Sequence, residues 1–379
     1  MKLVYCICSV YNPGGMERVL LNKITYLVKQ GMYDITVVTT DQKNRLPFYP
    51  FPQEVRLIDL GINYSDNNGK GAIAKTLSYL QKKRLHQQRL AALLEDEKPD
   101  IVISLYPSES SFYPSLKDGS KKILELHYCK FFRLQYGRKG LLGWMDKLRT
   151  WQDERIVRKF DKFVVLSNED RGYWGELPNI QVIPNAALFV AKKHSDVSRK
   201  RIIAVGRLDY QKGFDRLIEA WRIVQQHPEF QDWQLDIFGQ GEWKEMLQGR
   251  VQQYGLQDTL HINAPTKQIG EEYANSSMLV MSSNYEGFPM VMIEAMACGL
   301  PVVSFDFQCG PKDIIQPEVN GLLVKNGDIP GLAEAMMRVM GDEAMCKRMS
   351  EEAKKVTETY SEEKVMKLWM DLFDGLTKK

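Results

Sequence analysis

Short apolar runs alternate with amphipathic stretches along most of this chain, and this alternation limits its fold more than any other feature. Such runs are typical of buried strands, whereas apolar residues spaced by three and four are typical of helices. The strands expected in the first half span 3–9, 35–39, 55–59, 101–105, 122–126 and 163–167. Those expected in the second half span 201–205, 234–238, 260–263, 278–281 and 301–304. Strands that alternate with helices predict an α/β fold with parallel sheets.

Helical patterns fill most of the intervals between these strands. They span 16–30, 72–95, 144–159, 214–226, 243–254, 269–274, 289–297, 331–340 and 342–357. A chain of 379 residues is longer than one hydrophobic core usually organises, so we expect two units. We predict a first unit over 1–188 and a second over 199–360, joined by the aperiodic stretch 186–198. The amphipathic tail within 361–379 is expected to form a helix that returns to the first unit.

Composition excludes several classes of protein. The chain is 44% hydrophobic and 26% charged, which is ordinary for a globular protein and does not indicate disorder. No apolar run approaches the roughly 18 residues that a membrane-spanning helix needs. The apolar run at 3–10 is too short for a signal peptide and reads as a buried strand. The six cysteines contain no CxxC pair, which favours a reducing cytoplasm.

The charge of the chain is distributed unevenly. Residues 1–190 hold 28 basic and 20 acidic side chains, or +8, and the remainder holds 23 and 28, or −5. The basic excess lies in 70–90, which contains no acid, and in 117–162. Each stretch is either a solvated helix face or a surface for an anionic membrane. No DNA- or RNA-binding signature accompanies them, so a nucleic-acid partner is not expected.

One segment places two carboxylates around the start of a helix. Glu286 and Glu294 are separated by seven residues, with Gly287, Phe288 and Pro289 between them. Proline is favoured at the first turn of a helix, so Glu286 precedes the helix and Glu294 lies within it. Both side chains can then reach a ligand on the helix N-terminus, where backbone N–H groups favour phosphate or hydroxyl oxygens. Acidic residues are also common near helix starts for structural reasons, so this segment alone leaves both interpretations open.

Glycine-containing junctions between strands and helices occur elsewhere in the chain. Gly14 and Gly15 follow the first strand, and Gly239 follows the strand at 234–238. Arg207 and Lys212 flank a loop that opens the next helix. A guanidinium fork and a compact ammonium together suit a diphosphate. Parallel α/β sheets bind ligands at the carboxyl ends of their strands, where all these junctions are expected to lie.

The ordered set of these motifs resembles the retaining glycosyltransferases of family 4. The matching segments are Gly14-Gly15-Met16-Glu17, Ile183-Pro184-Asn185, Gly206-Arg207-Leu208 with Lys212-Gly213, Gly239-Gln240-Gly241, and Glu286 through Glu294. The resemblance spans most of the chain and is tighter in the second half. It implies the GT-B architecture, in which two Rossmann-like domains face each other across a cleft.

The resemblance also implies roles for matching positions. Arg207 and Lys212 would hold the donor diphosphate and stabilise the leaving group, and Glu294 would accept the ribose hydroxyls. Glu286 and the backbone at 287–289 would contact the donor sugar. Gly14 and Gly15 would approach the diphosphate from the other domain, with Gly239 at a further loop of the site. His127 matches a family histidine near the donor sugar, although a lone histidine is more often structural.

Members of the family transfer the sugar with retention and without a metal, and we expect the same here. The segment 304–315 resembles members that use UDP-hexoses or UDP-N-acetylhexosamines, although Phe307-Gln308-Cys309 departs from the usual pattern and leaves the sugar open. The basic first unit fits a saccharide or polyprenyl-diphosphate-linked acceptor, with attachment to the inner face of the cell membrane as a hypothesis. Two alternatives stay open: a GT-B nucleotide-sugar epimerase, and a non-catalytic nucleotide-sugar-binding partner of another transferase.

Overall fold

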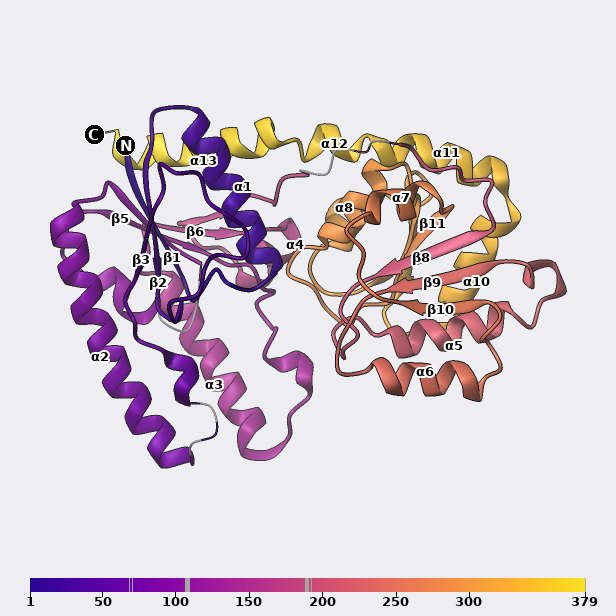
Figure 1. Cartoon of the computed structure of the whole chain (residues 1–379), viewed down its shortest axis with the longest axis horizontal. Coiled ribbons are helices and arrows are strands. Elements are labelled where there is room, and N and C mark those ends of the chain that lie inside the picture. The colour runs from indigo at the N-terminus through magenta and orange to yellow at the C-terminus, as the bar shows by residue number, and fades with distance from the viewer. Residues whose placement is uncertain (68, 70, 106–109, 188–190, 192, 379) are drawn as a thin grey trace.

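Two parallel β-sheets form the frame of the molecule, as the computed structural model shows (Figure 1). The structure describes residues 1–67, 69, 71–105, 110–187, 191 and 193–378. The first sheet has the strand order β3-β2-β1-β4-β5-β6-β7, and the second has the order β10-β9-β8-β11-β12-β13. Every pairing of strands is parallel, which confirms the predicted α/β fold with two Rossmann-like units.

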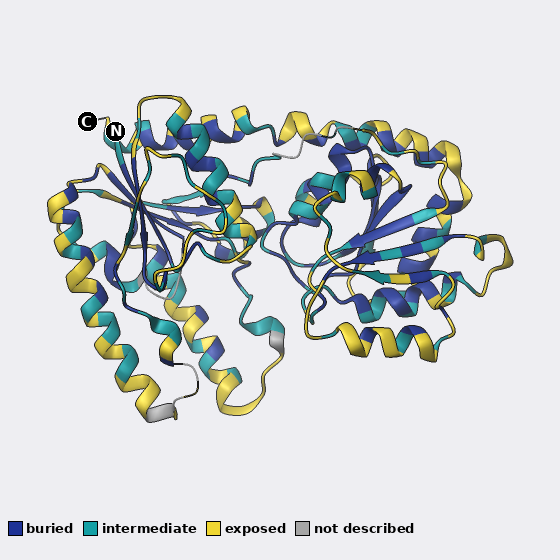
Figure 2. Cartoon of the chain, viewed as in Figure 1, coloured by how far each residue is buried: buried dark blue, intermediate teal, exposed yellow. Residues whose placement is uncertain are grey.

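The first sheet and its covering helices come from residues 2–182. Its strands are β1 Lys2–Ile7, β2 Asp34–Thr39, β3 Arg56–Asp59, β4 Ile101–Ser104, β5 Lys121–Glu125, β6 Lys162–Val165 and β7 Ile180–Val182. Its helices are α1 Gly15–Lys29, α2 Ala72–Glu97, α3 Gly140–Val157 and α4 Asn168–Trp174, with 3₁₀ turns Tyr64–Asn67, Ser110–Ser115 and Leu134–Tyr136. In Figure 1 the ends of α2 and α3 extend well beyond the sheet, and Figure 2 shows these ends as largely exposed.

The second sheet is built from residues 201–325. Its strands are β8 Arg201–Val205, β9 Gln234–Phe238, β10 Leu260–Asn263, β11 Met278–Met281, β12 Val302–Asp306 and β13 Gly321–Lys325. The helices are α5 Phe214–Val224, α6 Lys244–Gln253, α7 Ile269–Ala274, α8 Met290–Ala297, α9 Pro311–Ile314, α10 Ile329–Gly341, α11 Glu343–Lys354 and α12 Val356–Thr359, with a 3₁₀ turn at Pro228–Phe230. One continuous apolar cluster holds this unit together.

The last helix, α13 (Glu362–Thr377), packs on the first sheet rather than the second. Its buried face, with Trp369 and Phe373 at its centre, joins the cluster formed by α1 and the strands. The opposite face of the sheet is covered by α2 and the end of α3. The chain therefore crosses between the units twice, and the crossings touch where the Ala187 N–H donates to the Tyr360 carbonyl at 2.6 Å.

Some bounds differ from those predicted, and two edge strands were not predicted. β7 has three partly buried residues, and β13 buries only two of its five, so neither gives a strong apolar signal. The helix expected from residue 289 begins at Met290, with Pro289 as its N-cap. Of the expected linker, 188–190 and 192 lie outside the described residues, and Ser195 and Asp196 donate backbone hydrogen bonds to the second unit. Lys70 of the first basic stretch also lies outside them. Within the described residues, no helix is both long and apolar enough to cross a bilayer.

Candidate functional site

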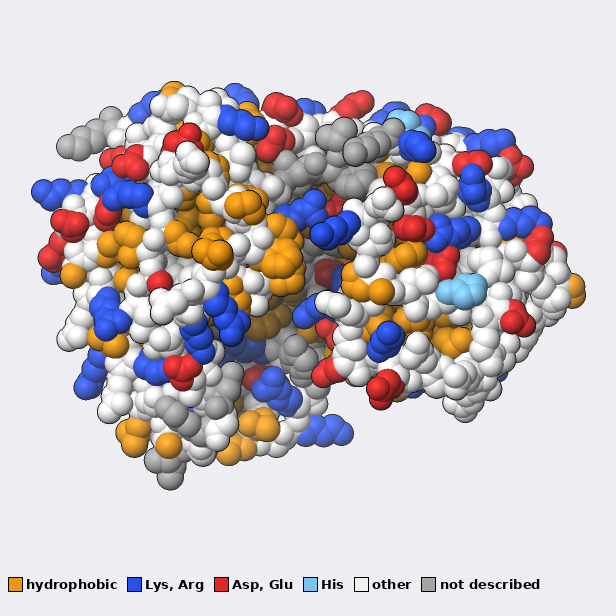
Figure 3. Space-filling view, in the orientation of Figure 1, with side chains coloured by type: hydrophobic (Ala, Val, Ile, Leu, Met, Phe, Trp, Pro, Cys, Tyr) orange, Lys and Arg blue, Asp and Glu red, His pale blue; other side chains and the backbone are white. Residues whose placement is uncertain are grey.

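A cleft of about 1690 Å³ separates the carboxyl ends of the two sheets. Figure 3 shows a hollow between the two lobes, with basic side chains around it. From the first unit, the cleft is lined by the start of α1, the loop after β5, and parts of α2 and α3. From the second, it is lined by the loops that follow β8 and β11. Both sheets therefore present their ligand-binding edges to the same space.

The second unit contributes a network of hydrogen bonds centred on Glu286. β8 and β11 are neighbours where the strand order reverses, so the loops after them meet. One oxygen, Oε1, accepts from Lys212 Nζ at 2.7 Å and from Ser283 Oγ at 2.8 Å. The other accepts from Gln211 Nε2 at 3.0 Å. Lys212 and Glu286 are both largely buried, with side-chain exposures of 12% and 8%. We term this network the donor wall; its members hold one another in place through these hydrogen bonds.

Arg207 stands at the edge of this network. Its guanidinium donates to Gln211 Oε1 at 2.6 Å and lies 3.4 Å from Asp209. The side chain is 69% exposed, unlike that of Lys212. Arg207 is therefore free to turn toward a ligand, whereas Lys212 is held in place.

Gly239 lies directly behind this loop. A Cβ at Gly239 would fall 1.9 Å from the Gly206 carbonyl oxygen, so the two backbones approach too closely for any other residue. Gly239 does not line the cleft. Gly239 lets the backbone that follows β9 pack directly against the backbone that follows β8.

The first unit brings Gly14 and Gly15 to the cleft at the start of α1. Both residues line it, and Gly14 is the N-cap of the helix. The Glu17 carboxylate folds back over this helix start, so that a Cβ on Gly14 would lie 2.0 Å from Glu17 Oε2. Burial raises the pKa of Glu17, and the charge of His127 partly opposes that rise. A carboxylate thus covers a helix N-terminus, a position that suits an anion.

His127 lines the cleft, and the buried side chains of Glu125 and Lys23 lie next to it. Its Nε2 lies 3.1 Å from Glu125 Oε1 without forming a hydrogen bond to it. Glu125 Oε1 accepts from Lys23 Nζ at 2.5 Å, and the Lys23 ammonium lies 3.7 Å from the Trp369 ring centroid. Burial alone would raise the pKa of Glu125, but the charges of Lys23 and His127 lower it to about 2. Glu125 is thus an anion held close to the ring of His127.

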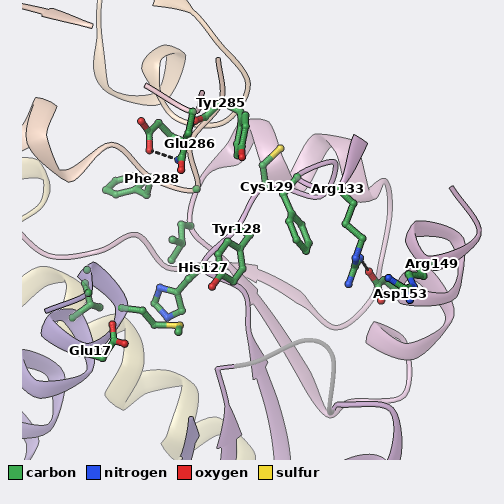
Figure 4. Close-up of a pocket in the computed structure, with 18 of the residues that line it drawn as sticks. Glu17, His127, Tyr128, Cys129, Arg133, Arg149, Asp153, Tyr285, Glu286 and Phe288 are labelled. Atoms are coloured by element: carbon green, nitrogen blue, oxygen red, sulfur yellow. Dashed lines mark hydrogen bonds and ion pairs between the residues drawn. The ribbon is translucent and has the colours of Figure 1, made fainter. Parts of the chain in front are cut away.

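The loops of the two units come into close contact at Gly287. A Cβ at Gly287 would lie 2.0 Å from the His127 carbonyl oxygen, so glycine allows the second unit to reach the first. In Figure 4, Glu286 and Phe288 lie above the loop that carries His127 and Tyr128. The ring of Phe288 also contacts Tyr360, at 5.7 Å between centroids, where the chain crosses back.

Glu294 is partly exposed and lies within α8, about one turn from its start, as predicted. It does not line the cleft, and neither does Pro289. Burial raises the pKa of Glu294, and the charges of Arg18 and Lys212 oppose the rise. Its carboxylate is therefore within electrostatic reach of both units.

The opposite side of the cleft, formed by α3 and the loop after β5, carries aromatic and basic side chains; we term it the acceptor wall. Tyr128 and Phe132 stack at 5.2 Å between ring centroids, and Arg133 lies over Phe132 at 4.5 Å. Arg133 also pairs with Asp153 of α3 (Figure 4). Further cleft-lining side chains on this side are Lys75, Lys83, Arg138, Arg149, Trp151 and Arg155. Aromatic faces beside cations suit sugar rings that carry negative charge.

The cleft thus brings together many of the predicted positions. Those that line it are Gly14, Gly15, His127, Arg207, Lys212, Glu286, Gly287 and Phe288. Gln211, Ser283 and Glu125 were not singled out from the sequence. Gln211 and Ser283 lie inside recognised motifs, so their positions offered a signal. Glu125 offered none, because its partner Lys23 is 102 positions away.

Comparison with known families divides the chain in two. Residues 13–187 match the family described as Glycosyltransferase Family 4, and residues 187–356 match Glycosyl transferases group 1. Together the matches span 13–356, which includes every strand of the two sheets except β1, and they meet at the first crossing between the units. The amylovoran biosynthesis glycosyltransferase AmsD of Erwinia amylovora is 27% identical, over 98% of this chain and 99% of its own. A poly(ribitol-phosphate) alpha-N-acetylglucosaminyltransferase of Staphylococcus aureus is 24% identical, over 89% of this chain and 69% of its own.

Solved structures share the arrangement of the whole chain. S. aureus TarM, crystallised as a point mutant in complex with fondaparinux, alpha-GlcNAc-glycerol and UDP, superposes with a TM-score of 0.78 at 16% identity, covering 98% of this chain and 99% of its own. Anabaena HepE in complex with UDP gives a TM-score of 0.75 at 16% identity, covering 99% and 100%. At these identities the likeness establishes the fold.

Proposed function

Because this chain belongs to the glycosyltransferases of the GT-B architecture, we propose that it moves a hexose or N-acetylhexosamine from a UDP-sugar to a saccharide or lipid-linked acceptor, with retention. The observation that carries this proposal is the Lys212–Glu286 pair, held at 2.7 Å and facing Gly14, Gly15 and His127 across the cleft. A cation fixed opposite a helix N-terminus forms a clamp for a diphosphate. The alternatives from the sequence, an epimerase and a non-catalytic partner, require no acceptor wall.

UDP is the favoured donor nucleotide. TarM and HepE were crystallised with UDP, and both share the fold over nearly the full chain. In this chain we assign Glu294 to the ribose hydroxyls, because its partly exposed carboxylate can accept from two hydroxyls at once. Arg18 and Lys212 compensate its charge from the two sides. The Gly287–Phe288 backbone and Glu286 then face the sugar.

The chemistry proposed is electrostatic. As the bond to the sugar breaks, negative charge grows on the diphosphate, and Lys212 and Arg207 stabilise it in a partly closed cleft. Lys212 keeps donors available for phosphate oxygens while it remains paired with Glu286. Glu286 accepts from three side chains, which lowers its nucleophilicity, so we assign it to positioning the sugar rather than to covalent attack. We propose that these cations replace a metal at this step.

The acceptor would lie along α3 and the loop after β5. Tyr128 and Phe132 offer a stacked aromatic face, and Arg133 and Arg149 supply charge at the other end of the cleft (Figure 4). This arrangement suits a saccharide bearing phosphate or diphosphate, such as a polyprenyl-diphosphate-linked sugar. The start of α3 exposes Leu141, Leu142 and Trp144. These apolar groups beside basic residues support peripheral attachment to an anionic membrane, which we propose lies on the inner face of the cell membrane.

A thermal-shift series tests the donor proposal. UDP, GDP, ADP and their common sugar conjugates are added to the full chain with and without EDTA, and the rise in Tm over the matching ligand-free sample is measured. Binding to the folded state raises Tm by mass action. We expect a rise with UDP and with one UDP-sugar, and the same rise in EDTA. If GDP gave the larger rise, or EDTA abolished the rise with UDP, the UDP or the metal-free part of the proposal would be wrong.

The stabilising UDP-sugar is then incubated with acceptors, and the products are separated. Transfer with retention requires a new α-linkage from an α-linked donor, which NMR of the anomeric proton reports. Isomerised donor formed without any acceptor would instead identify an epimerase. Binding with neither product, across phosphate-bearing saccharides and lipid-linked sugars, would favour the non-catalytic alternative.

A further inference from the structure

Two cysteines from different units meet at the edge of the cleft. Cys129 follows β5 in the first unit, and Cys309 precedes α9 in the second; both are buried, at 1% and 0% exposure. Asp170 of α4 is also buried and lies between them. One ligand atom of each of the three residues lies within 4.8 Å of the others, and Cys309 Sγ is 3.5 Å from Asp170 Oδ1. The transfer chemistry proposed above uses none of these groups.

The backbone at Cys309 is in an unusual conformation. Its φ of +66° is left-handed, which a cysteine seldom adopts. The Cys309 N–H donates to Glu169 Oε2 at 3.0 Å, so a neighbour of Asp170 in the other unit holds this conformation. Strained backbone that persists only because its surroundings fix it is a common mark of a functional site. Here the effect is to aim the thiol of one unit at the thiol and carboxylate of the other.

Hydrogen bonds from its own unit hold the Asp170 carboxylate in place. Asp170 accepts from the Lys130 N–H at 2.8 Å and from Trp174 Nε1 at 3.3 Å, yet burial raises its pKa to about 6 and the charge of Glu169 adds to the rise. The neighbouring Cys129 thiol, burial and Asp170 all raise the pKa of the Cys309 thiol. A dication at this cluster would favour the thiolate and the carboxylate as its ligands.

We propose that Cys129, Asp170 and Cys309 form a zinc-binding site that ties the two units together. Two sulfur ligands and one carboxylate suit Zn²⁺ and disfavour the hard cations Mg²⁺ and Ca²⁺. Bonds of about 2.3 Å to sulfur and about 2.1 Å to oxygen at a tetrahedral centre place S and O about 3.6 Å apart. The observed Cys309 Sγ to Asp170 Oδ1 distance is 3.5 Å. A water or the Gln308 amide oxygen, 4.0 Å from Cys129 Sγ, completes the fourth position.

This ion would be structural. Its ligands come from both units, so it binds only when the units are together and it stabilises that arrangement. It lies outside the Lys212–Glu286 network, so the proposed transfer step remains free of metal. Chelation should therefore lower the Tm of the ligand-free protein while leaving the rise produced by UDP unchanged.

Zinc titration of the reduced, untagged full chain tests this proposal. The protein is stripped with a chelator and titrated with Zn²⁺ against a chromogenic competitor. We expect one equivalent to bind and Tm to rise. Cys309→Ser should weaken binding more than about 100-fold, since loss of a direct ligand exceeds the 10–100-fold cost of losing a supporting residue. Cys346→Ser is the matched control, because Cys346 is equally buried but belongs to α11.

Binding of Co²⁺ in place of Zn²⁺ tests which side chains are the metal ligands. Co²⁺ bound to thiolates gives a near-ultraviolet charge-transfer band, which we expect in the wild type and in Cys346→Ser but not in Cys129→Ser. Asp170→Asn keeps the side-chain shape, so it serves if a serine variant fails to fold; it should keep the band and weaken Zn²⁺ binding at least tenfold. Equal zinc affinity in all variants, or no stoichiometric binding, would overturn the proposal. So would a Cys129–Cys309 disulfide found by mass spectrometry in protein purified without reductant.

Discussion

The donor wall and the acceptor wall face the same cleft but are built in different ways. In the donor wall, short loops that directly follow strands hold Lys212, Gln211, Ser283 and Glu286 in one network of hydrogen bonds. In the acceptor wall, long side chains such as Arg149 and Trp151 project from α3 and are exposed. A network in which each group fixes the next loses its geometry when one member is removed. Where side chains are exposed, as those of Arg149 and Trp151 are, removal of one costs only that member.

The largest effect is expected from Lys212→Ala. In the proposed mechanism its ammonium stabilises the charge that develops on the leaving diphosphate, and its loss also leaves Glu286 buried without its cation. Removing one such preorganised group lowers kcat by about 10²–10³-fold. Lys244→Ala, at an exposed position on α6, is the matched control and should keep full activity. A loss below tenfold for Lys212→Ala would mean that the donor wall is no more interdependent than the acceptor wall.

Gly287→Ala should rank next, because it acts where the two walls touch. The added methyl would lie 2.0 Å from the His127 carbonyl oxygen, which forces the walls apart by about an ångström. Misplacement of that size costs on the order of 100-fold in rate. Gly249→Ala in α6 meets nothing within 4 Å and serves as the control. Rate assays and Tm should both be measured. Normal turnover in Gly287→Ala would show that the contact is dispensable.

The third effect concerns the stability contributed by Glu125, which lies next to His127, and it should appear only at acidic pH. The folded-state pKa of Glu125 is about 2, below its usual 4.5. A lowered carboxylate pKa adds stability above the unfolded value, and that stability is lost as pH falls from about 4.5 to about 2. The loss amounts to roughly 3 kcal/mol at most. Denaturant titrations across this range should show it, and the curve for Glu125→Gln should be flatter. Parallel curves for the two proteins would contradict this account.

The smallest effect is expected in the acceptor wall. Arg149→Ala removes one exposed charge, and exposed ion pairs contribute about 0.2–1 kcal/mol. KM for a phosphate-bearing acceptor should rise about fivefold at most, and the affinity for UDP should not change. Arg158→Ala, just past the end of the same helix, controls for net charge. If Arg149→Ala matched the loss in Lys212→Ala, the contrast between the walls would have to be abandoned.

The same contrast explains what could be predicted from the sequence. The residues of the donor wall sit in strand–loop–helix junctions, where glycine spacing and flanking charge form local motifs. Arg207, Lys212 and Glu286 could therefore be named, although Lys212 and Glu286 are 74 positions apart. The two parallel sheets could be predicted from the apolar runs alone. Their edge strands β7 and β13 could not be predicted, because they are short or poorly buried.

Other parts of the site depend on contacts that no local pattern reveals. Lys23, Glu125 and Trp369 come from three distant segments and are brought together only by packing on the first sheet. The charge of Arg18 reaches Glu294 only because the two units meet. The cysteine–aspartate cluster likewise exists only when Cys129 and Cys309 meet across the units.

The path of α13 has a consequence for how the chain is made. The first unit buries Trp369 and Phe373 in its core, yet the ribosome adds these residues only after the whole second unit. At about 5–20 residues per second, the roughly 180 residues that intervene take some 10–40 seconds. During that interval the apolar face of β1 and α1 lacks its cover, and the buried charge of Lys23 lacks the ring that packs on it. The first unit is therefore begun first but completed last, and it is the part of the nascent protein most exposed to chaperones and to aggregation.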